Sequence, residues 1–263
     1  MTRRHLAFSC ERDTLVGTLD DSDAAIGLLI VSGGNEVRCG AFGGSADLAA
    51  YMAREGFPVF RYDRRGIGDS EGENRGFANS QEDIAAALAA FRGMKPKLRH
   101  VVAMGNCDAA SALMCANLPF DAMVLTNPWT YDEEAKEGPP PAAAIRSRYI
   151  AKLRNPREVW RLLRGGVDLR KLAVGLRQAA APSPTVSDLS REMRSSLDAF
   201  GGKTTILLAE ADRTAQAFDA CWNAGAETII RRAAADHAFS KPADQAWLRD
   251  RILEVLRAFA SAD

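Results

Sequence analysis

Apolar positions along the chain form short runs that alternate with longer segments of helical spacing. The run Ala25–Ser32 is apolar at nearly every position, which is typical of a strand buried on both faces. Further strands are predicted at Pro58–Tyr62, His100–Met104, Met123–Thr126, Thr204–Leu208 and Glu227–Arg231. Helices are predicted at Ser45–Glu55, Gln81–Arg92 (capped by Ser80), Ala109–Asn117, Ala215–Ala224 and Asp244–Phe259. The alternation predicts an α/β fold with a mostly parallel central sheet flanked by helices.

The alternation stops over residues 128–196. This segment opens with the run EGPPP and continues with Arg-rich stretches of helical spacing. Between Arg146 and Arg177 there are ten Arg or Lys residues against two acids, Glu158 and Asp168. Long loops without structure are rare in compact domains. We therefore expect an α/β core formed by residues 1–127 and 197–263, interrupted by a helical cap at 128–196.

Composition narrows the class of protein. The 34 basic and 34 acidic residues give a net charge of zero, so overall charge favours no nucleic-acid partner. The five cysteines form no CxxC pair and only three histidines accompany them, which indicates neither disulfides nor a zinc site. No apolar stretch reaches the roughly 18 residues of a membrane helix, and no secretory signal is evident. We expect a cytoplasmic protein without metal or cofactor.

The segment HVVAMGNCDAAS carries the most specific chemical signal. A buried strand that turns sharply into a helix exposes one side chain at the turn, provided that small residues flank it. In this nucleophile elbow, usually G-x-S-x-G, the central position here is Cys107, between Gly105 and Ala109. The alternative is an inert buried cysteine on an ordinary turn. Ser111 is a competing nucleophile, but it would lie one helical turn beyond the elbow.

Partners for Cys107 follow in the order nucleophile, acid, histidine. His237 is the one histidine beyond residue 107, and it lies between the last predicted strand and the last predicted helix. Asp212 comes just after the strand Thr204–Leu208, with Glu210 as a rival acid. Alone, His237 reads as a surface histidine and Asp212 as a helix N-cap. Together they predict a Cys107–His237–Asp212 triad at the carboxyl ends of neighbouring strands.

An acyl-transfer site also needs two N–H groups for the oxyanion. The first is expected from Asp108, at the start of the helix after Cys107. The second is expected from Gly34 or Asn35, in the loop after the first buried strand. A glycine pair permits close approach of the backbone to a substrate oxygen, although any tight turn can contain one.

Three motifs make residues 25–259 resemble the α/β-hydrolase superfamily. The loop RYDRRGIGDSEG resembles the segment after the fourth strand of that superfamily, in which Ser70 is structural and not a nucleophile. The segments GNCDAAS and SGGNEVRCG more narrowly resemble the exosortase A system-associated hydrolases. A cysteine at the elbow is also similar to dienelactone hydrolases, which use a Cys-His-Asp triad. Alanine at the second glycine position of the elbow is a minor departure.

The resemblance implies acyl chemistry: cleavage of an ester, thioester or lactone through an acyl-thioester on Cys107. It also implies that the segment 128–196 is a lid, whose Arg residues would guide an anionic substrate or contact an anionic membrane surface; the alternative is a solvated basic face. Phe42, Trp129 and Trp160 are candidates for an acyl pocket, or else plain core. Rival functions are an acyltransferase or thioesterase acting on a carrier, and an inactive binding protein that retains the fold. The oligomeric state is left open.

Overall fold

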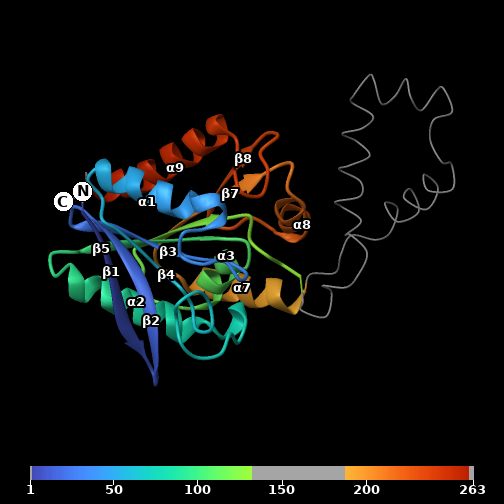
Figure 1. Cartoon of the computed structure of the whole chain (residues 1–263). Helices are drawn as coiled ribbons and strands as arrows, with labels where there is room; N and C mark the ends of the chain where they lie inside the picture. Colours follow the sequence, from blue (N-terminus) through green and yellow to red (C-terminus); the bar gives the residue numbers. More distant parts are fainter. Residues whose placement is uncertain (1, 132–186, 261–263) are drawn as a thin grey trace, which may run out of the picture.

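The computed structural model describes residues 2–131 and 187–260. In this part of the chain eight strands form one sheet, in the order β1-β2-β4-β3-β5-β6-β7-β8 (Figure 1). The strands are β1 Thr2–Cys10, β2 Asp13–Asp21, β3 Ile26–Val31, β4 Val59–Tyr62, β5 His100–Asn106, β6 Ala122–Thr126, β7 Lys203–Ala209 and β8 Thr228–Arg232. From β4 to β8 neighbouring strands are parallel, whereas β2 is antiparallel to both of its neighbours. The predicted α/β-hydrolase fold class is confirmed.

The antiparallel hairpin at the start of the sheet was not predicted from the sequence. β1 and β2 pair along their full length, from Thr2 opposite Asp21 to Cys10 opposite Asp13. β1 is exposed at most positions, so it lacks the continuous apolar run that identifies a strand buried on both faces. The hairpin therefore adds two strands before the first strand that the sequence predicts.

Two layers of helices cover the sheet, one on each face (Figure 1). The helices are α1 Gly44–Arg54, α2 Gln81–Met94, α3 Asp108–Cys115, α7 Asp188–Ala199, α8 Arg213–Cys221 and α9 Pro242–Ala260, with short 3-10 turns at Ala41–Gly43 and Phe77–Asn79. Side chains of α1 and α9 share one core cluster, and those of α2, α3, α7 and α8 share the larger one. None of these helices is long and apolar enough to cross a bilayer.

The predicted helices and strands from residue 25 onward recur with their ends shifted by a few residues. One detail of the prediction was wrong. Ser80 occupies the position before α2, but its hydroxyl donates to the carbonyl oxygen of Phe77, at 2.6 Å, and caps no N–H of the helix. The acidic residues Glu82 and Asp83 occupy the first turn instead, where the helix dipole favours negative charge.

Helix α7 begins inside the range for which a cap was predicted. Its Met193 and Leu197 are buried in the larger core cluster, so this part of the range belongs to the packed α/β layers. Ser187 caps α7 by accepting the N–H of Ser190 at 3.0 Å and donates to the carbonyl of Thr130 at 2.7 Å. The Arg-rich stretch lies outside the described residues.

Candidate active site

Cys107 lies at the turn between β5 and α3, in a strained backbone conformation. Its φ of 61° and ψ of −126° are rare for a residue with a side chain. A Cβ at Gly105 would come within 2.7 Å of the Ala109 backbone, so the strand and the helix meet too closely for any side chain there. The Cys107 N–H donates to Thr126 O at 2.9 Å, which ties the turn to β6. The geometry is that of a sharp strand–turn–helix elbow with its central side chain presented at the apex.

The structure brings the side chains of Cys107, His237 and Asp212 together. Nδ1 of His237 lies 2.9 Å from Oδ2 of Asp212, and the Cys107 thiol lies close enough to the His237 ring to raise its pKa. The same Oδ2 accepts the N–H of Ala215 at 3.0 Å, so Asp212 is also the N-cap of α8. The two interpretations of Asp212, as an N-cap and as the partner of the histidine, therefore hold at once.

The environment of His237 favours its protonated form. The hydrogen bond to Asp212, followed by the hydrogen bond to Cys107, raises the pKa of His237 to about 10, against the opposing effect of partial burial. Asp212 is only 10% exposed, whereas the imidazole is 42% exposed. It is Asp212, and not the rival Glu210, whose carboxylate lies against the imidazole; Glu210 is on the exposed side of the strand end.

Ser111 is fully buried, one turn into α3. Its hydroxyl donates to the carbonyl oxygen of Trp129 at 2.6 Å. This hydrogen bond therefore links α3 to the segment that follows β6. This agrees with the prediction that Ser111 is a helix residue one turn beyond the elbow.

The two predicted oxyanion segments contact each other directly. The N–H of Gly34 donates to Oδ1 of Asp108 at 2.7 Å, so a carboxylate occupies this donor in the structure. Gly34 has a φ of 54°, and a Cβ at Gly33 would lie 2.6 Å from the same carboxylate oxygen. Asn35 points elsewhere: its Oδ1 accepts from Nδ2 of Asn74 at 2.9 Å. The N–H of Gly34 is therefore bonded to the residue that follows Cys107.

Side chains of the loop after β4 bond to the turn formed by Gly33 and Gly34 (the glycine turn) and to β2. Arg64, which is almost fully buried, donates to the carbonyl oxygen of Gly34. Ser70 accepts the N–H of Val16 at 2.9 Å and donates to Asp63 O at 2.7 Å. These bonds fix the loop to β2 and leave the Ser70 hydroxyl fully engaged, as expected for a structural serine.

The three aromatic candidates for an acyl pocket have different environments. Trp129 packs partly buried against the larger core cluster, and its indole N–H donates to Tyr131 O at 2.8 Å. Phe42 is fully exposed among the described residues, with a relative exposure of 104%. Trp160 lies outside the described residues. A role for any of them in substrate binding stays a prediction.

Two further residues lie beside the predicted triad without having been predicted from the sequence, Tyr131 and Asn127. Burial, followed by the charge of Asp212, raises the pKa of the Tyr131 phenol to about 12, so this group is a hydrogen-bond donor at neutral pH. Its ring packs edge-on against Trp129, with centroids 4.6 Å apart. Asn127 is fully buried and donates to the carbonyl of His237 at 3.1 Å. The available signal was that both follow β6, Asn127 directly and Tyr131 four residues later.

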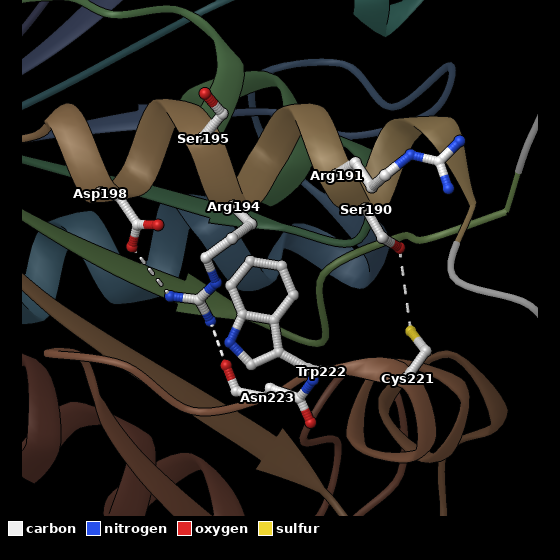
Figure 2. A pocket seen from close by; sticks show the side chains of 8 residues that line it. All are labelled: Ser190, Arg191, Arg194, Ser195, Asp198, Cys221, Trp222 and Asn223. Atoms are coloured by element: carbon white, nitrogen blue, oxygen red, sulfur yellow. Dashed lines mark hydrogen bonds and ion pairs between the residues drawn. The ribbon is translucent and has the colours of Figure 1, made fainter.

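A cavity of about 360 Å³ lies between α7 and α8 (Figure 2). Arg194 reaches across it, with its guanidinium carbon 4.0 Å from the centre of the Trp222 ring (Figure 2). The same guanidinium forms ion pairs with Glu227 at 2.8 Å and Asp198 at 3.3 Å. Its charge is therefore already balanced by protein carboxylates. Among residues 2–131 and 187–260, no three His, Cys, Asp or Glu side chains gather in a way that could hold a metal ion.

Solved structures with the same fold cover almost the whole chain. DcsB, solved in complex with a substrate analogue, matches with a TM-score of 0.63 at 15% identity, over 98% of this chain and 99% of the other. The α/β hydrolase GrgF from Penicillium sp. sh18 also matches with a TM-score of 0.63, at 16% identity, over 98% and 99%. An esterase of Pyrococcus furiosus has a TM-score of 0.63 at 12% identity, over 98% and 91%. At these identities the likeness establishes the fold alone.

Sequence comparison gives the family. No curated protein matches this chain at a significant level. A family model described as serine aminopeptidase, S33, matches residues 24–181, more than half of the chain, including the elbow and the glycine turn. The chain therefore belongs to this hydrolase family, within the α/β-hydrolase superfamily.

Proposed function

We propose that this hydrolase cleaves an ester, thioester or lactone by transferring the acyl group to Cys107. One observation carries the proposal: the thiol at the strained apex of the elbow lies close enough to His237 to raise its pKa, and Nδ1 of His237 lies 2.9 Å from Asp212. A nucleophile, a base within hydrogen-bond reach and a group that orients the base are the three parts that covalent acyl transfer needs.

The reaction proceeds in two steps. The thiol proton first passes to His237, which gives the protonated ring that its surroundings favour. The sulfur anion then bonds to the carbonyl carbon, the bond from that carbon to the leaving group breaks, and His237 passes the proton to the leaving group. Water then attacks the thioester as His237 takes its proton; the carbon–sulfur bond breaks and the proton returns to sulfur. Asp212 holds the ring in place and stabilises its charged form.

The carbonyl oxygen becomes negatively charged in both steps. The N–H groups of Gly34 and Asp108 would bind it, one from the glycine turn and one from the start of α3. The Asp108 carboxylate, which accepts from Gly34 at 2.7 Å, has to release that N–H before an oxyanion binds there. Rotation of the Asp108 side chain away from Gly34 would free this N–H.

Cys107 is favoured over the other thiols by its surroundings. Burial raises the pKa of Cys10 to about 11 and that of Cys115 to about 12, so both remain protonated thiols at neutral pH. The thiolate is the reactive form of cysteine. Cys107 is the thiol that lies close enough to His237 to raise the pKa of its ring.

The proposal extends to the kind of substrate that carries the acyl group. The glycine-turn and elbow motifs favour the exosortase A system-associated hydrolases, and the ten basic residues between Arg146 and Arg177 favour an anionic substrate. Raising the ionic strength tests the second point, because screening should raise the KM for an anionic ester more than that for a neutral ester. Equal changes for the two esters would count against guidance by these residues.

The test of the nucleophile uses p-nitrophenyl acetate with the wild-type protein and two variants. Cys107→Ala should abolish acetate release and remove the acetyl mass from the peptide that contains residue 107 after rapid quenching. Cys115→Ala changes the cysteine at the end of the helix that follows Cys107. This variant is the matched control and should retain both acetate release and the acetyl mass. Circular dichroism checks that each variant is folded. Unchanged turnover in a folded Cys107→Ala protein would exclude the proposed nucleophile.

Product analysis separates hydrolysis from transfer. Free acid as the product in the presence of a thiol or amine acceptor supports hydrolysis, and an acylated acceptor supports a transferase. A protein that neither turns over the ester nor becomes acetylated would instead be a binding protein on the same fold.

A further inference from the structure

Asn127 occupies a buried position directly after β6. It is fully buried and has a φ of 45°, a left-handed conformation that Asn tolerates better than most residues. Its own N–H donates to Leu207 O at 3.1 Å, which fixes the backbone to β7. The side chain is thereby directed among the carboxyl ends of three parallel strands.

Every hydrogen-bonding group of this amide has a partner. Nδ2 donates to the carbonyl of His237 and to Oδ1 of Asn106, each at 3.1 Å. Oδ1 accepts the N–H of Ala209 at 2.8 Å. The acceptor and the two donors are matched to groups of the opposite kind, and this fixes the orientation of the amide.

These partners belong to the three segments that carry the candidate triad. Asn106 directly precedes Cys107, Ala209 lies three residues before Asp212, and the third partner is the backbone of His237 itself. We infer that Asn127 is a positioning residue whose amide holds these segments in register, so that the thiol, the imidazole and the carboxylate meet. This inference rests on the proposed function for its catalytic consequence.

A second bond reinforces the same link. Nδ2 of Asn106 donates to the carbonyl of His237 at 3.5 Å, and its Oδ1 accepts the hydroxyl of Thr126 at 2.8 Å. The carbonyl of His237 therefore has two amide donors, one from β5 and one from the end of β6. Removing the Asn127 amide leaves the carbonyl of His237 with only the longer bond from Asn106 and leaves the N–H of Ala209 without its acceptor. Because buried polar groups left without partners are costly, the segments that carry His237 and Asp212 are then expected to shift.

Asn127→Gly tests the inference, because glycine keeps the left-handed backbone and removes only the side chain. The readout is an NMR titration of the three histidines in the full chain, which isolates His237 from His5 and His100. In the wild-type protein the pKa of His237 should lie near 10. In Asn127→Gly it should fall toward the ordinary value of about 6.5, and kcat should fall about 100-fold, as for an ångström-scale misplacement.

Two control variants separate positioning from general destabilisation. Asn117→Gly makes the same change at a φ of 44°, at the far end of α3, and should alter neither readout. Asp121→Ala removes the bonds to the Val101 N–H (2.8 Å) and to His100 (2.8 Å), at the opposite end of β5 and β6. It should lower the melting temperature without moving the His237 titration.

The outcomes distinguish this inference from the proposed function. A His237 pKa in folded Asn127→Gly protein that equals the wild-type pKa would overturn the positioning role, whatever the activity. A titration that moves as expected in a protein whose Cys107 is never acetylated would support the positioning role and reject the proposed acyl transfer.

Discussion

The main-chain N–H of Gly34 donates a 2.7 Å hydrogen bond to the carboxylate of Asp108, the residue that follows Cys107. Both residues belong to the proposed oxyanion hole, so the structure holds an intramolecular anion where a reaction would place its own. A hydrogen bond to a charged group is stronger than one between neutral groups. In the proposed mechanism, Asp108 therefore competes with the substrate for the N–H of Gly34.

Asp108→Ala should raise kcat/KM for a neutral activated ester. A hydrogen bond to a charged group contributes about 1.5–3 kcal/mol, so freeing Gly34 should give an increase of about tenfold or more. Asp47→Ala removes a carboxylate from the first turn of α1 and is the matched control, with no change expected. Steady-state kinetics with p-nitrophenyl acetate measures both. A loss of activity in a folded Asp108→Ala protein would mean that the carboxylate assists the reaction.

Asp212→Asn should lower kcat about 1000-fold, because an amide does not stabilise the imidazolium and can select the wrong tautomer. The pKa of His237 should also fall, since its bond to Asp212 is the largest cause of the increase. Glu210→Gln alters the rival acid two residues earlier and should leave kcat and the titration unchanged. A large effect of the Glu210 change would reassign the acid.

The sequence was sufficient to predict the parallel part of the sheet and the candidate site, for one physical reason. Strands buried on both faces require uninterrupted apolar runs, and residues that follow such runs gather at one edge of the sheet. Cys107, Asp212 and His237 each follow a predicted strand, and the structure brings their side chains together.

Other features have no comparable pattern in the sequence. The hairpin of β1 and β2 is missing from the prediction because β1 is mostly exposed. The role of Asn127 depends on partners from segments more than 80 residues away in the chain, Ala209 and His237. The bond between Gly34 and Asp108 likewise joins residues that are 74 positions apart, so neither local sequence reveals it.

Gly105→Ala should destabilise the protein, because its Cβ would lie 2.7 Å from the carbonyl carbon of Ala109 and 2.8 Å from the nitrogen of Ala110. These are backbone atoms of α3, so relief requires the helix to move away from β5. Overpacking of this kind costs about 1–3 kcal/mol. Gly93→Ala is the control: its Cβ meets nothing within 4 Å, and alanine in this helix should stabilise the protein by about 1 kcal/mol. Urea denaturation measures both, and equal stabilities would contradict the tight elbow.

The contribution of His237 to stability should depend on pH in a defined direction. Its pKa is raised from 6.5 to about 10 in the folded protein, so folding favours the protonated ring. The resulting stabilisation is fully present below pH 6.5 and is lost as the pH rises through about 10. The wild-type protein should therefore exceed His237→Gln in melting temperature by more at pH 6 than at pH 10. In a Cys107→Ala background the dependence should shrink but persist, since the bond to Asp212 is the larger cause. A difference that grows with pH would show that the folded protein favours the neutral ring.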